Sequence, residues 1–134
     1  DLQRFARRYQ MPMRFNPHFP LNTLLLMRMA TGLQLRQPER FEHFVATVFR
    51  AIWVDALNLG DMNVLAEVLG RAGFDPQALQ ALAGEQEVKD RLKVTTEEAV
   101  SRGVFGAPCM FVGDELFFGQ DRLDFVREAL LAAG

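Results

Sequence analysis

A short segment near the end of the chain carries residues whose types and spacing could form a ligand site. Residues 103–123 read GVFGAPCMFVGDELFFGQDRL, with Ala107-Pro108 directly before a short apolar run. A proline cannot donate a hydrogen bond to a strand ladder, so Pro108 lies at a sheet edge or makes a sharp turn. After a second apolar run, Asp121 can cap the helix that follows. The segment thus predicts two polar turns joined by a pair of strands.

The single cysteine limits the chemistry open to the chain. Cys109 has no partner in the sequence, which excludes an internal disulfide, a Cys-x-x-Cys redox centre and a cysteine zinc site. We expect Cys109 to be a small buried apolar residue, because a reactive thiol needs a lowered pKa. We predict no metal site.

The composition is that of a folded globular domain. The 134 residues are 49% hydrophobic and 24% charged, which provides enough apolar surface to offset the entropy of ordering the chain. The net charge of -2 argues against nucleic acid as the main partner. No run approaches the ~20 apolar residues needed to cross a bilayer, so we predict no membrane segment. The 12 phenylalanines predict an aromatic core or an apolar pocket.

The elements that must position the segment are mostly helical. Apolar spacing, caps and prolines predict six helices before it, at residues 1–9, 22–35, 38–56, 61–73, 75–83 and 85–102. The apolar face of the third helix is predicted to contain Phe41, Val45, Val48, Phe49, Ile52 and Ala56. Three prolines between residues 10 and 21 predict an extended connector after the first helix.

The last part of the chain changes character. Runs rich in β-forming residues at 109–112 and 115–118 enclose Gly113-Asp114, which predicts a two-residue hairpin turn. A final helix is predicted from Arg122 to about residue 132. We expect its apolar face to turn inward, with Leu123, Val126, Leu130 and Leu131 on it.

Three further residues could line a site or merely support the fold. Trp53 shares the third helix with large apolar residues and is expected in the helical core, with the wall of an aromatic substrate pocket as the alternative. Asn16 and His18 lie on the connector, where we expect surface polar residues, although loops often carry function.

The motifs FGAP, GDE and FGQDRL, in this order over residues 105–123, resemble the C-terminal end of 2-hydroxychromene-2-carboxylate isomerases. That family is related to kappa-class glutathione S-transferases and shares a thioredoxin-like fold with a helical insertion of the DsbA type. The resemblance extends upstream through DLQRFARRYQMPMRFNPHFPLNT and FRAIWVDALNLGD and covers essentially the whole chain. It implies a mostly α, α+β chain that is the C-terminal part of a thioredoxin-like fold. Residues 15–84 would be the helical insertion domain, and residues 1–14 and 85–134 would belong to the thioredoxin-like domain.

The resemblance also implies a glutathione site. Pro108 matches the family's cis-proline, although the bare frequency of ~5% for cis X-Pro bonds favours trans. Ala107 matches the residue whose backbone pairs with the cysteinyl group of glutathione. Gln120, Asp121 and Arg122 match the turn that holds the γ-glutamyl end, where an aspartate can pair with the ammonium and helix N-terminal N–H groups favour the carboxylate. The family's catalytic serine has no counterpart here, so the catalytic residue is unknown.

Two features predict that part of the protein is missing. The first helix begins without a start signal, and two strands do not make a stable sheet. We therefore expect a C-terminal fragment that lacks the N-terminal strand–helix–strand and is inactive by itself.

The resemblance implies a glutathione-dependent isomerase of aromatic hydrocarbon degradation. It would take a small aromatic substrate, reside in the cytoplasm and form a homodimer. Within enzymes, the first alternative is a kappa-class transferase that conjugates glutathione to electrophiles. The second is a disulfide oxidoreductase, which the absence of Cys-x-x-Cys disfavours. An alternative of another class is a non-catalytic helical module whose apolar face binds a partner protein.

Overall fold

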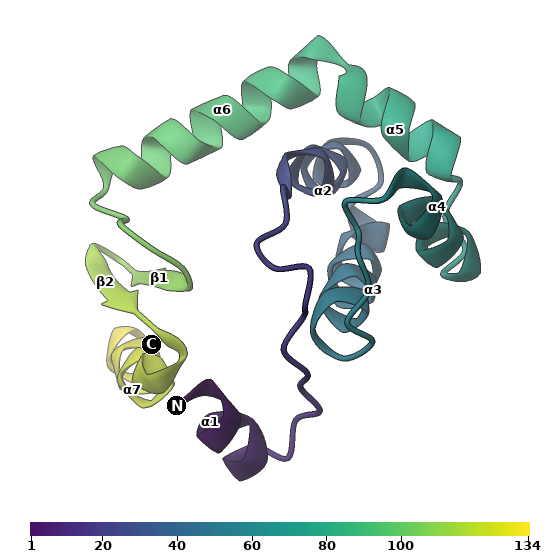
Figure 1. The fold of residues 1–134 in the computed structure, drawn as a ribbon. Helices are drawn as coiled ribbons and strands as arrows, with labels where there is room; N and C mark the ends of the chain where they lie inside the picture. Colours follow the sequence, from purple (N-terminus) through teal and green to yellow (C-terminus); the bar gives the residue numbers. More distant parts are fainter. The chain divides into compact units, whose positions relative to one another are not determined.

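The computed structural model describes all 134 residues, which form two compact units (Figure 1). The first, residues 1–92, is called the helical unit below, and the second, residues 93–134, is called the hairpin unit. The predicted insertion domain at residues 15–84 falls inside the helical unit. Its boundaries, and the assignment of the flanking residues to a thioredoxin-like domain, stay predictions.

The predicted helices are present. They are α1 (Leu2–Arg8), α2 (Leu24–Arg36), α3 (Phe41–Trp53) after the 3-10 turn η1 (Pro38–Arg40), α4 (Met62–Arg71), α5 (Pro76–Gly84) and α6 (Gln86–Ser101), which runs from one unit into the other. Two of them start as the sequence predicts. The Asp61 carboxylate accepts from the N–H groups of Asn63 and Val64, and the Asp75 carboxylate caps α5 in the same manner.

The core of the helical unit is apolar and comes mainly from α2, α3, α4 and α5. Its buried members are Leu26, Met29, Leu33, Phe44, Ala51, Ile52, Leu59, Leu65, Leu69, Phe74, Leu79 and Ala83. Helices α2 and α5 approach closely at Gly32. A Cβ at this position would lie 2.6 Å from Cγ of Leu82, so the contact requires glycine. One turn further along α2, the Arg36 guanidinium donates hydrogen bonds to the carboxylates of Glu87 and Glu85. These two carboxylates raise the pKa of the guanidinium.

The buried face of α3 differs in part from the prediction. Ile52 is buried as expected, but Phe44 and Ala51 accompany it, and the Phe49 side chain is 62% exposed. Ala56 lies beyond the helix end, which is at Trp53. The prediction of a helix is confirmed, but the face of α3 that packs on α2 and α4 is rotated relative to the predicted face. Several apolar residues could form the buried stripe, and tertiary packing decides which of them do.

The connector between α1 and α2 is fixed by a buried polar residue, which corrects the prediction of a surface Asn16. Its side chain is fully buried and donates to the carbonyls of Ile52 (3.0 Å) and Leu57 (2.8 Å), while its Oδ1 accepts from the N–H of His18 (2.7 Å). Asn16 thus satisfies carbonyl groups at the end of α3. The His18 residue is exposed, as predicted.

The hairpin unit contains the two predicted strands with their predicted bounds. Strand β1 (Cys109–Val112) pairs antiparallel with β2 (Glu115–Phe118), and the register runs from Cys109 opposite Phe118 to Val112 opposite Glu115. Gly113 has φ +57°, which suits the tight turn between the strands.

The start of the last helix differs from the prediction. A 3-10 turn, η2 (Gln120–Arg122), precedes α7 (Leu123–Ala133), and Asp121 lies within that turn without capping α7. The expected inward face is also wrong, since Leu123, Leu130 and Leu131 are exposed and only Val126 is partly covered. The apolar stripe is present, and β1 contacts α7, but this contact leaves the three leucines exposed. No helix has the length and apolar character required to span a membrane.

Candidate functional site

The end of the hairpin opposite its turn brings the five predicted site residues together. The N–H of Gly119 donates to the carbonyl of Pro108 at 2.9 Å, one step beyond the last strand pair. The turn before β1 and the turn after β2 therefore lie side by side. We call this region the hairpin base, and it consists of Ala107, Pro108, Gln120, Asp121 and Arg122.

The proline side of the hairpin base has the geometry that the family resemblance implied. The Ala107–Pro108 peptide bond is cis, which confirms that prediction. The same structure has a second cis bond, Phe19–Pro20, which the sequence did not indicate. Ala107 is exposed, and its backbone N–H and carbonyl make no hydrogen bond within the chain. These groups are open to a peptide-like ligand.

The acidic side of the hairpin base is a turn built on Gly119. This glycine has φ +102°, and a Cβ placed on it would lie 2.6 Å from Oδ1 of Asp121. Glycine is therefore needed both for the backbone angle and to let the carboxylate fold back over the turn. The other carboxylate oxygen pairs with Arg122 at 2.8 Å, and both side chains are about half exposed. An exposed pair of this kind contributes only ~0–1 kcal/mol to stability and opens easily.

Aromatic packing fixes the strands behind the hairpin base. The rings of Phe105 and Phe118 lie 4.7 Å apart, and Gly106 leaves only enough room for Phe118, since a Cβ there would lie 2.7 Å from that ring. Nearer the hairpin turn, the Arg102 guanidinium lies 3.6 Å from the centre of the Phe111 ring and donates to the Gly113 carbonyl. No motif in the sequence indicates this contact of Arg102.

The single cysteine lies at the start of β1, next to the hairpin base. Cys109 is half-buried and pairs with Phe118 across the hairpin, so the prediction of a buried residue is wrong. No group of three or more His, Cys, Asp or Glu side chains is placed to hold a metal ion.

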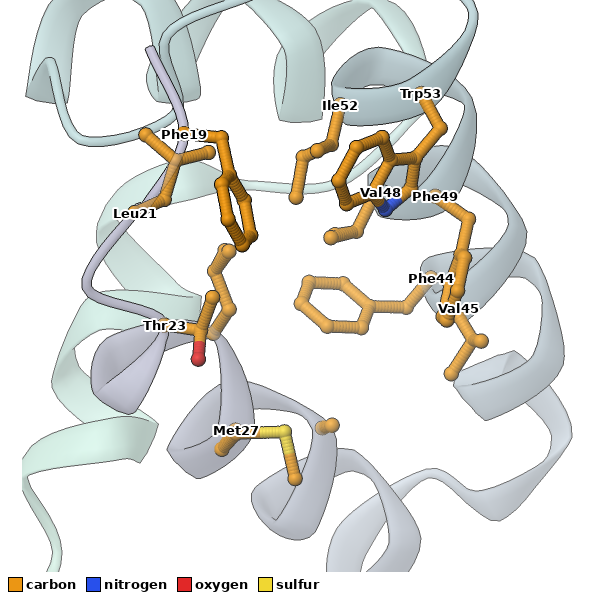
Figure 2. A pocket seen from close by; sticks show the side chains of 12 residues that line it. Phe19, Leu21, Thr23, Met27, Phe44, Val45, Val48, Phe49, Ile52 and Trp53 are labelled. Carbon is orange, nitrogen blue, oxygen red and sulfur yellow. The ribbon is translucent and has the colours of Figure 1, made fainter. Parts of the chain in front are cut away.

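Trp53 lies at a pocket within the helical unit, where it also packs against the core (Figure 2). Trp53 therefore packs on the helical core as expected, and its alternative role as the wall of an aromatic substrate pocket stays a prediction. The pocket has a volume of about 240 Å³ and lies between α2, α3 and the connector. The sequence predicted an apolar pocket from the phenylalanine content but did not indicate the walls formed by Phe19 and Phe44.

Comparison with known proteins places the chain in a family. Residues 1–131 match the family model of the DSBA-like thioredoxin domain. A 2-hydroxychromene-2-carboxylate isomerase from Sphingobium xenophagum is 33% identical over 131 residues, which cover 98% of this chain and 65% of that protein. Human glutathione S-transferase kappa 1 is 25% identical over 142 residues, which cover 97% of this chain and 63% of that protein. The chain thus spans less than two thirds of the length of these relatives.

Solved structures agree with this assignment. A structure of 2-hydroxychromene-2-carboxylate isomerase superposes with a TM-score of 0.80 at 29% identity, covering 99% of this chain and 64% of that one. A putative protein disulfide isomerase from Nitrosomonas europaea shares the fold alone, with a TM-score of 0.74 at 19% identity. The chain is a member of the DSBA-like thioredoxin domain family, and its relatives include 2-hydroxychromene-2-carboxylate isomerases and kappa-class glutathione transferases.

Proposed function

We propose that this chain supplies the glutathione-binding hairpin and the helical domain of a glutathione-dependent isomerase that acts on 2-hydroxychromene-2-carboxylate in aromatic hydrocarbon breakdown. The observation that carries the proposal is the hairpin base. It unites the five residues that resemble the glutathione site of the family, in a chain whose relatives include isomerases of this name.

The groups present at the hairpin base fit the parts of glutathione. Glutathione is a peptide with an ammonium and a carboxylate at its γ-glutamyl end. The free backbone N–H and carbonyl of Ala107 can pair with the cysteinyl peptide groups in the manner of an added strand. When bound there, glutathione would supply a thiol whose reversible addition to a conjugated substrate allows a C–C bond to rotate.

The role proposed for Asp121 is to hold the ligand's ammonium. Its carboxylate now pairs with Arg122 at 2.8 Å, so the ammonium would share or replace that partner. Because the existing pair is exposed, the exchange costs little. Backbone N–H groups at the start of η2 and α7 would favour the γ-glutamyl carboxylate. Arg122, once released from Asp121, would add a second donor for that carboxylate.

Glutathione transfer is the second candidate activity, because the human relative named above is a kappa glutathione transferase. In that case the thiol would stay attached to an electrophile as the product, and no isomer would form. Both activities use the same contacts at the hairpin base, so the product distinguishes them better than the binding.

The experiment is an assay of the chain, alone and within any longer protein that contains it, with 2-hydroxychromene-2-carboxylate in the presence and absence of glutathione. We expect the longer protein to form the ring-opened benzylidenepyruvate only when glutathione is added. Consumption of glutathione with a chlorodinitrobenzene, without isomerisation, would favour the transferase instead. Isomerisation at an equal rate without glutathione would contradict both proposals.

A further inference from the structure

The pocket in the helical unit has walls that are almost entirely apolar. Phe19 and Leu21 face it from the connector, Trp53, Val48 and Phe49 from α3, and Phe44 lies deeper, as Figure 2 shows. No charged side chain lines the pocket. Such a surface favours ligands without a formal charge, because a charge placed there would lose water without gaining a partner.

Three aromatic rings cluster at one part of the pocket, two of them in its wall. Phe19 and Trp53 have their ring centres 5.8 Å apart and tilted by 46°, and Phe15 stands edge-on to both at 6.0 and 6.5 Å. Phe15 and Phe19 are nevertheless 68% and 53% exposed. Phe19 and Trp53 line the pocket, whereas Phe15 packs against both of them from outside its lining. Tilted and edge-on ring pairs are the arrangement that aromatic side chains favour with another flat ring.

The volume of the pocket sets the size of its ligand. An engineered apolar cavity of ~150 Å³ in another protein stays dry and binds benzene, whereas drug-sized ligands occupy ~300–1,000 Å³. The pocket here, at about 240 Å³, lies between these values. It therefore suits a ligand of one or two fused rings.

Two polar side chains in the wall can add specificity without adding charge. The Thr23 hydroxyl makes no cap bond to the helix that it precedes, and the indole N–H of Trp53 has no hydrogen-bond partner in the chain. Together they offer one acceptor and two donors at an otherwise apolar wall.

From these observations we infer that the pocket is a binding site for an uncharged aromatic compound of one or two rings. All residues of the site belong to the helical unit, and none of them is a residue of the hairpin base. The inference goes beyond the proposed isomerase reaction, whose substrate carries a carboxylate, and it does not depend on glutathione.

The test is a titration of the 134-residue chain with toluene, followed by the emission of Trp53, which is the only tryptophan. Excitation at the red edge of indole absorption avoids absorption by the probe. We expect a saturable change in emission with toluene. Benzoate has the same ring but carries a carboxylate, and we expect it to bind at least about tenfold more weakly, since the charge would be desolvated without a partner.

Variants that fill the pocket test whether toluene binds there. Ala30 contributes one methyl group to the wall, and Ala30→Leu should fill part of the space and weaken toluene binding at least about tenfold. Gln34→Leu adds the same side chain to an exposed position of the same helix and should leave the affinity unchanged. Val45→Phe is a second filling variant, because Val45 lines the pocket but lies outside the tightly packed core. Circular dichroism identifies any variant that fails to fold.

Three results would overturn the inference. The first is the absence of a saturable response in the wild-type chain. The second is equal binding of toluene and benzoate, or unchanged toluene affinity in a folded filling variant. The third is sedimentation as a dimer at the concentrations used, with the toluene response lost as the dimer forms, because a second copy would then be the natural occupant.

Discussion

Asp121 is the residue on which the proposed glutathione contact depends most. It is about half exposed, it does not cap α7, and its one ion pair is with a neighbouring residue. The Asp121 carboxylate therefore contributes little to the stability of the fold. Its exposure leaves it accessible to a ligand.

We predict that Asp121→Ala lowers glutathione affinity about tenfold to a hundredfold, the effect of losing one charge-assisted hydrogen bond. The unfolding free energy should change by no more than ~1 kcal/mol, because only an exposed ion pair is lost. Isothermal titration calorimetry and chemical denaturation measure the two quantities. Asp124→Ala removes the same charge from the first turn of α7 and is the matched control. Equal glutathione affinity in Asp121→Ala and the wild type would show that Asp121 makes no ligand contact.

Asn16 is the residue whose loss should most affect the connector. We predict that Asn16→Ala destabilises the helical unit by about 2–4 kcal/mol, because it leaves the Ile52 and Leu57 carbonyls without their buried donor. Asn22→Ala is the control, since Asn22 is exposed and accepts only from the N–H of Leu24. It should cost ~1 kcal/mol or less. Urea denaturation followed by circular dichroism compares the two, and similar losses would refute a special role for Asn16.

The two residues differ in how far the sequence could predict them. The role proposed for Asp121 rests on a local motif, because its neighbours Gly119, Gln120 and Arg122 are adjacent in the sequence. The burial of Asn16 depends on carbonyls more than thirty positions away. No local pattern encodes such a contact, so a polar residue between two prolines was expected at the surface.

Among the helical elements, two glycines provide a pair for comparison, Gly32 within α2 and Gly70 in the last turn of α4. In Gly70 of α4, an added methyl group meets no atom within 4 Å, whereas in Gly32 of α2 it would lie 2.6 Å from Cγ of Leu82. Helix propensity favours alanine at both positions by ~0.5–1 kcal/mol. If the two glycine-to-alanine substitutions change the unfolding free energy in opposite directions, the difference therefore comes from the packing of α2 on α5.

We predict that Gly70→Ala stabilises the protein by ~0.5–1 kcal/mol. Gly32→Ala should destabilise it by ~1–3 kcal/mol, the usual cost of overpacking a core. Thermal or urea denaturation of both variants tests the pair. Stabilisation by Gly32→Ala would mean that α2 and α5 are not held as closely as the structure has them.

The helices and strands were predictable because their signals are local. Asp61 and Asp75-Pro76 mark helix starts, and Gly113-Asp114 marks the hairpin turn, and all three features are present. The orientation of α3 and the exposure of α7 were not predictable. They depend on which neighbour covers which apolar stripe, and the spacing of apolar residues gives only the period and not the partner.

At the scale of the whole molecule, the two units differ in how much apolar surface they bury. Every fully buried hydrophobic residue belongs to the helical unit, with Val88 the last in sequence. The hairpin unit has one two-stranded sheet and α7, which has no buried residue. A two-stranded sheet is at best marginally stable by itself.

We predict that residues 1–92 expressed alone unfold cooperatively, whereas residues 93–134 expressed alone show no cooperative transition. Differential scanning calorimetry and near-ultraviolet circular dichroism test both pieces, and the entire chain serves as the reference. A cooperative transition in residues 93–134 would show that the hairpin, α7 and the exposed apolar side chains form a sufficient core after all.

Binding of glutathione at the hairpin base can be followed residue by residue in a nuclear magnetic resonance titration. Uniformly ¹⁵N-labelled chain is titrated with reduced glutathione, and amide shifts are followed residue by residue. We predict saturable shifts at Ala107, at Cys109 and through Gln120–Arg122, with the amides of α2 to α5 unchanged. Saturable shifts confined to the helical unit, or none at the hairpin base at saturating glutathione, would contradict it.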